Sequence, residues 1–545
     1  MCVRLFNHRG QARRPTLLTN ADLIVGILRD AGVRRLFGMP GGGSNADLVD
    51  AAGRGGLPFS LAHTETASAF MAAAQAEITG KLGACIATLG PGAASVMNGV
   101  AHAFLDRVPL LVLTDCYGES AARMGHQNLA QGAMFRPVVK WSARLRPGRV
   151  RAVLEEAIDM ATTPPAGPVH LDVASEVTRA AVAEEPDERP GRPAQAAGGT
   201  IPAALAEARR PVFLLGLGAR TPAIAAAVRG MCARFAIPAL VTYKAKGVVP
   251  DRHPWFGGVL TNGALERDIL ARADVFVAVG LDPVELLPRP WEFRQPVVSL
   301  TEWAMNQRQI PLAAELVGDV VGWLEAVAAL RQERTDWQGD EVFRLAEAQR
   351  ARMRVRGECV GLLPHRVVEL VASAYPGARA TVDAGAHMFP VMTFWPVAEP
   401  GGLLISNGLA TMGFGLPSAV GAALLNPPQV VVAFTGDGGL LMCLGELRTA
   451  VREGLRLRII VFDDGELSLI KVKQMERGYA ADSASIGRID WRAIGAGMGV
   501  AARAADSEEA LQAGIEDTVD EPGPVLIAAK IAAATYRDTI RALRG

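Results

Sequence analysis

The sequence predicts an α/β protein made of three doubly wound domains with parallel sheets. Three observations carry this prediction: a length of 545 residues, a composition that is 50% apolar, and short apolar runs that alternate with longer helical patterns. A compact domain holds about 150 residues, so this length indicates about three domains. Continuous apolar strands separated by helices are typical of parallel sheets that are covered on both faces.

Two polar stretches divide the chain into blocks. Residues 183–200 are rich in proline, glycine and charge, and residues 331–358 are charged with a helical pattern. Clusters of this kind mark loops and linkers between periodic segments. We therefore expect domains at residues 16–183, 195–335 and 355–545.

Each block contains its own strands and helices. Buried strands are expected at residues 35–39, 83–89, 109–114, 211–215, 274–279, 429–435 and 457–462. Helices are expected at residues 67–79, 94–103 and 440–453. Domains of this kind bind ligands beyond the carboxyl ends of their strands. Polar residues that directly follow a strand are therefore the first candidates for a site.

The composition excludes several classes of protein. Lys+Arg and Asp+Glu both total 56, so the net charge gives no reason to expect nucleic acid or an acidic membrane as a partner. No apolar run reaches the length of about 20 residues that a membrane span needs, and residues 1–15 lack the apolar middle of a signal peptide. The six cysteines are scattered without a CxxC pair, which fits a cytoplasmic protein without structural zinc or disulfides.

Two acidic turns follow neighbouring strands in the last block. Gly-Asp-Gly-Gly at 436–439 comes directly after one predicted strand, and Asp-Asp-Gly at 463–465 comes after the next. Parallel strands end at the same edge of a sheet, so Asp437 and Asp464 are expected to lie close together. Mg²⁺ prefers carboxylate ligands together with phosphate oxygens. The glycines let backbone N–H groups approach a diphosphate, and the helix that follows adds free N–H donors.

Each turn also has an ordinary explanation, because Asp-Gly is a common turn pair. The order of strand, acidic glycine turn, helix, strand and second acidic turn is much more specific than either turn alone. We therefore predict a site for Mg²⁺ and a diphosphate at this edge of the third sheet.

A glutamate stands before a predicted helix in the first block. Glu65 precedes the helix at 67–79, and the strand that follows leads to a Gly-Pro-Gly turn at 90–92. A carboxylate at a helix start is ordinarily explained by the helix dipole. Together, the first and third blocks resemble the acetolactate synthase, pyruvate oxidase and 2-oxo acid decarboxylase family of thiamine-diphosphate enzymes. The resemblance covers nearly the whole chain.

The resemblance implies a pyrimidine-binding first domain, a central domain and a diphosphate-binding last domain. Glu65 would hydrogen-bond N1′ of the aminopyrimidine and so promote removal of the C2 proton. Asp437 and Asp464 would be side-chain ligands of Mg²⁺, and Glu466 would add its backbone carbonyl. Met412 would support the bent cofactor, with plain core packing as the alternative. The implied cofactor-binding residues are Glu65, Gly90, Pro91, Gly385, His387, Ala410, Met412, Gly436, Asp437, Gly438, Gly439 and Leu467.

Other positions align with substrate contacts of the family. In the turn after the strand at 35–39, Gly42, Gly43 and Ser44 are candidates, although a plain turn is the alternative. His126 and Gln127 are candidate catalytic residues; the family places a glutamine near the cofactor, and a histidine in this loop could also bind a substrate carboxylate. Lys473 replaces a tryptophan of acetohydroxyacid synthases, which argues against pyruvate plus 2-oxobutyrate as substrates. A solvated helix face is the alternative for Lys473.

The expected activity is decarboxylation of a 2-oxo acid followed by carboligation to a second carbonyl compound, as in acetolactate synthases. A decarboxylase that releases an aldehyde, a flavin-dependent enzyme of pyruvate-oxidase type and a non-catalytic paralogue are the alternatives. The motif Leu-Gly-Leu-Gly at 215–218 is an incomplete dinucleotide signature, so we expect no FAD. The family's site is shared between chains, which implies a homodimer or homotetramer with the active site at the subunit interface.

Overall fold

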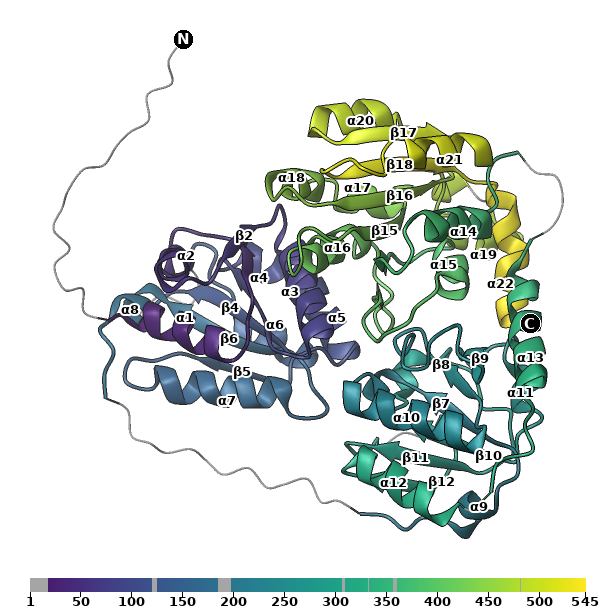
Figure 1. The fold of residues 1–545 in the computed structure, drawn as a ribbon. Helices are drawn as coiled ribbons and strands as arrows, with labels where there is room; N and C mark the ends of the chain where they lie inside the picture. Colours follow the sequence, from purple (N-terminus) through teal and green to yellow (C-terminus); the bar gives the residue numbers. More distant parts are fainter. Residues whose placement is uncertain are drawn as a thin grey trace.

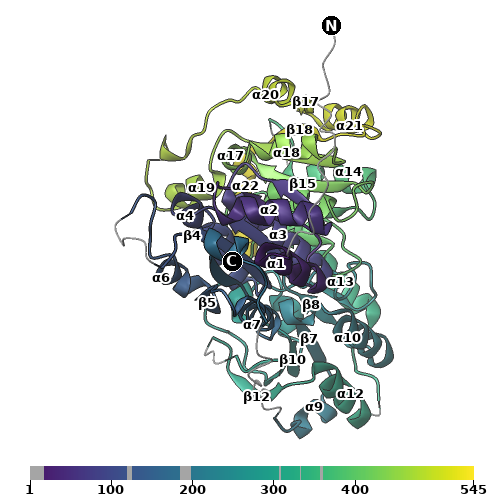
Figure 2. The ribbon, with the colours of Figure 1, turned by 90° about the vertical axis from the view of Figure 1, so that its left-hand side faces the viewer.

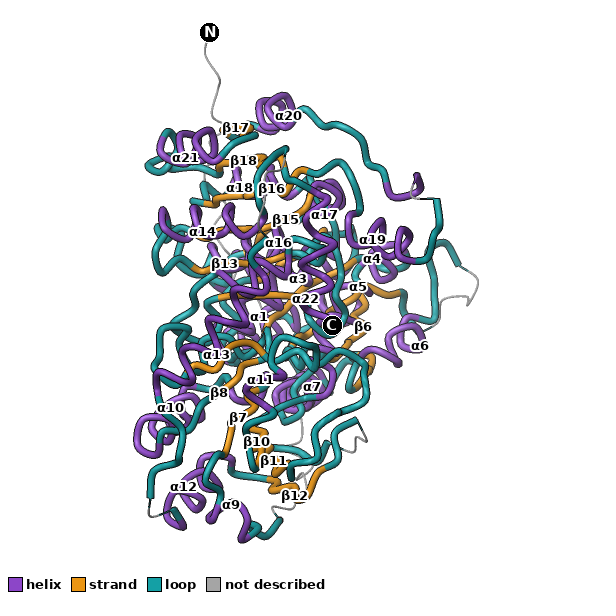
Figure 3. The backbone as a smooth tube through the Cα atoms, turned by 90° about the vertical axis from the view of Figure 1, so that its right-hand side faces the viewer, coloured by secondary structure: helices purple, strands orange, loops and turns teal. Residues whose placement is uncertain are grey.

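The chain folds into three domains, each around a six-stranded sheet whose strands all run parallel (Figure 1). The structure is a computed structural model, and it describes residues 18–119, 125–184, 198–305, 309–331, 333–355, 360–480 and 482–545. The predicted α/β fold with three parallel-sheet domains is thereby confirmed. Strands lie between flanking helices in each domain (Figure 3). None of the helices in these ranges combines the length and the apolar character that crossing a membrane requires.

The N-terminal domain has the strand order β2-β1-β3-β4-β6-β5. Strand β3 is buried along its whole length, as its apolar sequence predicts. The strands are β1 Leu36–Met39, β2 Phe59–Leu61, β3 Gly83–Ala87, β4 Leu110–Cys116, β5 Trp141–Arg144 and β6 Val169–Ala174. The helices are α1 Asn20–Asp30, α2 Ser44–Gly55, α3 Glu65–Thr79, α4 Pro91–Ser95, α5 Met97–Leu105, α6 Gln131–Phe135, η1 Arg136–Val138, α7 Val150–Thr162 and α8 Ser175–Arg179.

The central domain has the strand order β12-β11-β10-β7-β8-β9. Helices α10 and α12 pack against each other beside this sheet. The strands are β7 Pro211–Leu215, β8 Ala239–Val241, β9 Phe256–Val259, β10 Val275–Val279, β11 Val297–Thr301 and β12 Leu312–Val317. The helices are α9 Ala203–Glu207, η2 Leu217–Ala219, α10 Pro222–Phe235, α11 Arg267–Leu270, η3 Pro283–Glu285, α12 Val320–Leu330 and α13 Gly339–Met353.

The C-terminal domain has the strand order β14-β13-β15-β16-β18-β17. Its strands are β13 Arg379–Val382, β14 Leu403–Ile405, β15 Val431–Gly436, β16 Leu457–Asp463, β17 Ala501–Ala505 and β18 Val525–Lys530. Its helices are α14 Pro364–Ala374, α15 Met388–Phe394, α16 Gly415–Ala423, α17 Asp437–Met442, α18 Glu446–Arg452, α19 Ser468–Glu476, η4 Asp482–Ala484, α20 Trp491–Met498, α21 Glu508–Glu516, η5 Ala533–Thr535 and α22 Tyr536–Arg544.

The single helix expected at 440–453 is wrong in two respects. Helix α17 already begins at Asp437, directly after β15, and it ends at Met442 before α18 begins at Glu446. Asp437 is the first residue of α17, and its carboxylate accepts the Gly438 N–H at 2.6 Å within the first turn. The acidic glycine turn is therefore the first turn of a helix.

The charged segment expected as a linker at 331–358 contains a helix that belongs to the central sheet. In α13, Gln349 is buried and pairs with the edge strand β9 through both of its side-chain atoms. Its Nε2 donates to Val259 O at 2.9 Å, and its Oε1 accepts the Val259 N–H at 2.8 Å. The side chain thereby satisfies backbone groups that an unpaired strand edge would expose.

Helix α3 joins the N-terminal and C-terminal domains by packing against α16 (Figures 1 and 3). Figure 2 shows the molecule with the N-terminal helices α1, α2 and α3 toward the viewer. Both helices are rich in small residues, so their backbones approach closely. Gln75 Nε2 donates to Gly421 O at 3.0 Å. A Cβ atom on Gly421 would lie 2.4 Å from Met71 O, which leaves no room for a side chain.

We predict opposite effects for two glycine substitutions in helices. Gly421→Ala should destabilise the interface of α3 and α16 by about 1–3 kcal/mol, because the backbone of Met71 must move. Gly230→Ala is the matched control, since Gly230 is exposed in α10 and a Cβ there meets nothing within 4 Å. That change should stabilise α10 by about 0.8–1 kcal/mol. Thermal unfolding midpoints measure both effects, and a Gly421→Ala variant as stable as the wild type would contradict the packing.

Candidate active site

A cavity of about 210 Å³ lies at the carboxyl ends of the C-terminal sheet. The loops that follow β13, β15 and β16 form its walls, as the rule for parallel sheets requires. The residues predicted for this side of the site gather there, apart from Lys473. Those lining the cavity are Gly385, His387, Ala410, Met412, Gly436, Asp437, Gly438, Gly439, Asp464, Glu466 and Leu467.

Asp383 ties the walls of the cavity together from behind. It directly follows β13 and is fully buried. Its carboxylate accepts the N–H groups of Gly413 and Phe414, both at 3.0 Å, and the Thr435 hydroxyl at 3.1 Å. Burial raises the pKa of Asp383 to about 6, although these hydrogen bonds act in the opposite direction. Asp383 is not among the predicted site residues, although it directly follows a strand, as Asp437 does, and such residues are the first candidates for a site.

Asp437 and Asp464 meet at the ends of the adjacent strands β15 and β16. Asp437 Oδ2 accepts the Gly465 N–H at 2.7 Å, which joins the two acidic turns. The Ser468 hydroxyl donates to Asp464 Oδ2 at 2.7 Å. Burial and the charge of Asp437 raise the pKa of Asp464 to about 7. A divalent cation between these carboxylates would relieve their repulsion, and the donor set therefore suits Mg²⁺.

The side chain of Glu466 is directed to another partner. Its carboxylate forms an ion pair with the Lys471 ammonium one turn further along α19. This leaves the backbone carbonyl of Glu466 as its expected contribution to a metal, in agreement with the role that the family resemblance implies.

His387 lies against a glycine-lined wall of the cavity. Its ring stacks on Phe462 with centroids 5.3 Å apart, and burial lowers its pKa to about 3, so the imidazole is neutral. A Cβ atom on Gly385, where φ is +155°, would lie 2.6 Å from the ring. Among the residues that the structure describes, none forms a hydrogen bond with the buried Nε2. Buried polar atoms are normally paired, so this atom fits a ligand oxygen in the cavity.

Met412 and Leu467 approach the first turn of α17 from two sides. A Cβ atom on Gly438 would lie 3.3 Å from Met412 Cε and 3.0 Å from Leu467 Cδ2. Ala410 adopts the left-handed region with φ +51° on the turn that leads to Met412. The apolar side chains of Met412 and Leu467 thus pack against the glycine-rich turn, and all three line the cavity, which suits a cofactor with an apolar ring and a diphosphate.

Glu65 is the first residue of α3 and is nearly buried in the N-terminal domain. The Thr64 hydroxyl caps the helix by accepting the Ala67 N–H at 3.1 Å. The Glu65 carboxylate lies near the Gly-Pro-Gly turn, because a Cβ atom on Gly92 would lie 3.0 Å from its Oε1. No described residue forms a hydrogen bond with this carboxylate, and Glu65 does not line the cavity of its own C-terminal domain.

Gln127 lies against the turn at Gly90 and Pro91. The structure thus brings together residues that were predicted for the site from separate segments of the N-terminal domain. A Cβ atom on Gly90 would lie 2.5 Å from Gln127 O. Gln127 itself adopts the left-handed region with φ +58°. Gln131 was missed because no local pattern marks it. It is buried, accepts the Gly90 N–H at 2.9 Å and donates to Asp172 at 2.6 Å.

The predicted substrate contacts have different surroundings. The Ser44 hydroxyl is fully buried and donates to Asp115 Oδ1 at 2.8 Å, so it anchors the start of α2. Gly42, which has open space around it, and Gly43 therefore remain the predicted substrate contacts of this turn. His126 is exposed on the loop of Gln127. Lys473 is half-buried in the last turn of α19 and is not among the residues that line the cavity.

The glycine turn of the central domain is filled by the domain's own carboxylate. Leu217 N–H, between Gly216 and Gly218, donates to Glu285 Oε2 at 2.8 Å. Burial raises the pKa of Glu285 to about 8. The Leu217 N–H is therefore not free to bind a phosphate, and the expectation of no FAD stays a prediction.

We predict that Asp383→Asn loosens the cavity wall without unfolding the domain. An amide cannot accept at both of its atoms, so hydrogen bonds worth about 1.5–3 kcal/mol are lost. Hydrogen exchange of the Gly413 and Phe414 amides should then accelerate by about 10–100-fold. Asp490→Asn is the matched control, because asparagine caps a helix as well as aspartate does and Asp490 only caps α20. Unchanged exchange at residues 413–414 would refute the anchoring role.

Three family matches follow the order of the three sheets. Residues 18–134 match the N-terminal TPP binding domain of thiamine pyrophosphate enzymes. Residues 200–327 match the central domain of these enzymes, and residues 383–529 match their C-terminal TPP binding domain. The pyrimidine-side and diphosphate-side domains thus fall where the motifs predicted them.

Curated relatives match along almost the whole chain. The catabolic acetolactate synthase of Raoultella terrigena is 29% identical over 538 residues, which cover 95% of each chain. The acetolactate synthase of Bacillus subtilis (strain 168) is 28% identical over 93% of this chain and 92% of its own. The acetolactate synthase isozyme 1 large subunit of Escherichia coli (strain K12) is 29% identical over 94% of each. This chain therefore belongs to the thiamine pyrophosphate enzyme family, as a thiamine-diphosphate-dependent enzyme related to the acetolactate synthases.

Proposed function

We propose that this enzyme decarboxylates pyruvate and joins the resulting two-carbon unit to a second pyruvate, with Mg²⁺ as the metal. The observation that carries the proposal is the cavity at the ends of β15 and β16, where Asp437 and Asp464 face a glycine-rich helix start. Relatives named acetolactate synthases, similar along about the whole chain, support carboligation as the outcome.

The residues of the cavity fit thiamine diphosphate and its metal. Asp437 and Asp464 would hold Mg²⁺ with their carboxylates, and the Glu466 carbonyl would complete the protein ligands. The backbone N–H groups that follow Gly438 in α17 and His387 Nε2, which has no partner among the described residues, would hold the diphosphate. When bound, thiamine diphosphate supplies a nucleophilic carbon and accepts the electron pair that decarboxylation releases.

Glu65 would hold the pyrimidine ring by a hydrogen bond from its carboxyl group to N1′. Its carboxylate has no partner among the described residues, and its position at the start of α3 is fixed by the Thr64 cap. Gln127 and His126 would face the substrate from the same domain.

We further propose that two chains share each active site. Glu65 lies outside the cavity of its own chain, so the Glu65 that completes the cavity would be Glu65 of the partner subunit. Apolar side chains are exposed on α17 and α19 beside the cavity. Met442 is 65% exposed and Ile470 is 44% exposed, whereas a subunit interface would cover them.

Pyruvate is the proposed donor and acceptor because the relatives that match along about the whole chain are named acetolactate synthases. Release of acetaldehyde is the second outcome within the same chemistry. The glycine turn of the central domain, filled by Glu285, favours an enzyme without flavin.

We predict that the Glu65→Gln variant loses most of its activity while its fold is kept. A glutamine cannot share a proton with N1′, and general acid–base groups contribute about 10²–10⁴-fold to rates. Purified protein with thiamine diphosphate, Mg²⁺ and ¹³C-labelled pyruvate, followed by NMR, measures the products. Glu509→Gln on the exposed start of α21 is the control. Acetaldehyde as the sole product would replace the proposed carboligation, and full activity of Glu65→Gln would contradict the role of Glu65.

We predict that two inactive variants complement each other. Glu65→Gln and Asp437→Asn damage different halves of a shared site, so a heterodimer with one chain of each has one intact site and one doubly damaged site. Co-expression with two affinity tags, followed by purification through both tags, should recover about half of the wild-type activity per dimer, because activity counts intact sites. A heterodimer as inactive as its parents would show that each chain builds its own site.

A further inference from the structure

Five ionisable side chains form a buried cluster where the three domains meet, which we name the junction cluster. Glu77, His102 and Asp106 come from α3 and α5 of the N-terminal domain, and Arg220 and Lys244 come from the central domain. In Figure 1, α5 points toward the central domain at this place. None of the five residues lines the cofactor cavity.

Lys244 connects all three domains through its ammonium group. Its Nζ lies 2.6 Å from Glu77 Oε2 and 3.0 Å from Asp106 Oδ2. The third contact is to Ile405 O, at 3.1 Å, in the C-terminal domain. The Lys244 side chain is 1% exposed. A buried ammonium is tolerated only when its donors are paired, so this lysine holds the three segments in one arrangement.

The carboxylate of Asp106 connects Lys244 to the turn at 406–411, which directly precedes Met412. Asp106 accepts the Asn407 N–H at 3.1 Å and the Gly408 N–H at 2.7 Å. The fit is close, since a Cβ atom on Gly408 would lie 2.9 Å from Asp106 Oδ1. Asn407 also donates through Nδ2 to Glu285 O at 3.3 Å. The central domain therefore contacts this segment at two points, Ile405 through Lys244 and Asn407 through Glu285.

His102 holds the turn from a second point. Its Nδ1 lies 3.1 Å from Ser406 Oγ, and that oxygen in turn accepts the Thr411 N–H at 3.5 Å. Asn98 Nδ2 donates to Thr411 Oγ1 at 3.0 Å. Residues 406–411 are therefore bound at both ends, and Met412, which lines the cavity, follows directly.

We propose that Lys244 is a positioning residue for thiamine diphosphate, which acts through Asp106 and the turn at 406–411 to place Met412 in the cavity. The inference rests on the proposed function only in that Met412 supports the cofactor. It gives the central domain a task in the active site: its lysine sets the wall of a cavity in another domain.

The charges of the junction cluster balance. Glu77 and Asp106 carry two negative charges, Lys244 and Arg220 carry two positive ones, and burial lowers the pKa of His102 so that it is neutral. Removal of the Lys244 charge leaves two carboxylates with one guanidinium. Asp106 would then take up a proton or turn away, and either change weakens its hold on the amides of Asn407 and Gly408.

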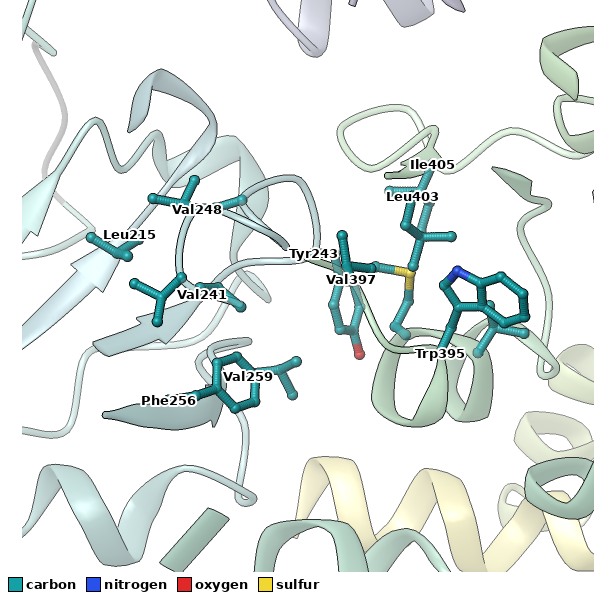
Figure 4. Close-up of a cluster of buried hydrophobic side chains, with 14 of the residues drawn as sticks. Leu215, Val241, Tyr243, Val248, Phe256, Val259, Trp395, Val397, Leu403 and Ile405 are labelled. Atoms are coloured by element: carbon teal, nitrogen blue, oxygen red, sulfur yellow. The ribbon is translucent and has the colours of Figure 1, made fainter. Parts of the chain in front are cut away.

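Lys246 offers a matched control two residues further along the chain. It is also buried and pairs with Asp251 Oδ1 at 2.7 Å. Asp251 Oδ2 accepts the N–H of Val397, so this pair too reaches the C-terminal domain. Figure 4 shows Tyr243 beside Val397 at this crossing. Lys246 makes no contact with residues 405–412 among the interactions of the described chain.

Lys244→Met and Lys246→Met in the full-length protein test the proposal. Both variants should lower the thermal unfolding midpoint, because each removes the lysine that forms an ion pair with a buried aspartate. In Lys244→Met alone, the Kd for thiamine diphosphate with Mg²⁺ should rise by about 10-fold or more, and amide exchange of residues 406–412 should accelerate without ligand. A wild-type Kd in Lys244→Met, or an equal rise in Lys246→Met, would overturn the proposal.

A double-mutant cycle with Met412→Ala tests the route of the effect. If Lys244 acts through Met412, its removal changes the Kd much less in the Met412→Ala background than in the wild type, whereas additive effects would overturn the route. If Lys244→Met does not fold, Asp106→Asn is measured in its place and should show the same pattern. Failure of the proposed function is distinguishable, since wild-type protein would then bind thiamine diphosphate without converting pyruvate.

Discussion

The buried carboxylate of Asp383 is the contact on which the candidate active site depends. A carboxylate in an apolar interior is stable only with several hydrogen-bond donors, and here they come from residues 413–414 and from Thr435. The turn of Met412 and the acidic end of β15 are thereby drawn to one point behind the cavity. The positions of Asp437 and His387, which line the cavity, follow from this convergence.

Buried charged side chains that are held by several partners also lie at the borders between the domains. Lys244 in the junction cluster forms buried ion pairs across the border between the central and N-terminal domains. The buried pair of Lys246 and Asp251 lies within the central domain and reaches the C-terminal domain through the Val397 N–H. Such pairs add little net stability, but breaking one partner is costly, so they favour a single relative arrangement of the domains. A cofactor held between loops of different domains needs one fixed arrangement of those domains, because small shifts of a residue in the cavity wall change how well the cofactor fits.

The central domain has the fold of a nucleotide-binding domain, but the glycine turn at the end of its first strand contacts protein groups. Its sheet has the glycine turn after β7 that nucleotide-binding domains place against phosphates. Here the Leu217 N–H donates to Glu285, and the Glu285 carbonyl accepts a hydrogen bond from Asn407 of the C-terminal domain. The end of the sheet that elsewhere binds a ligand therefore contacts the neighbouring domain, which agrees with a structural task for this domain.

The sequence by itself determined the three sheets and the residues at the carboxyl ends of their strands, because apolar runs and glycine-rich turns are local patterns. Strands β15 and β16, the acidic turns after them and Glu65 at the start of α3 were all predictable in this way. Only the tertiary structure decided the partner of Ser44, the role of Gln131 and the junction cluster. Glu77 and Lys244 are 167 residues apart, and no local pattern can pair two charges that only the packing of three domains brings out of water.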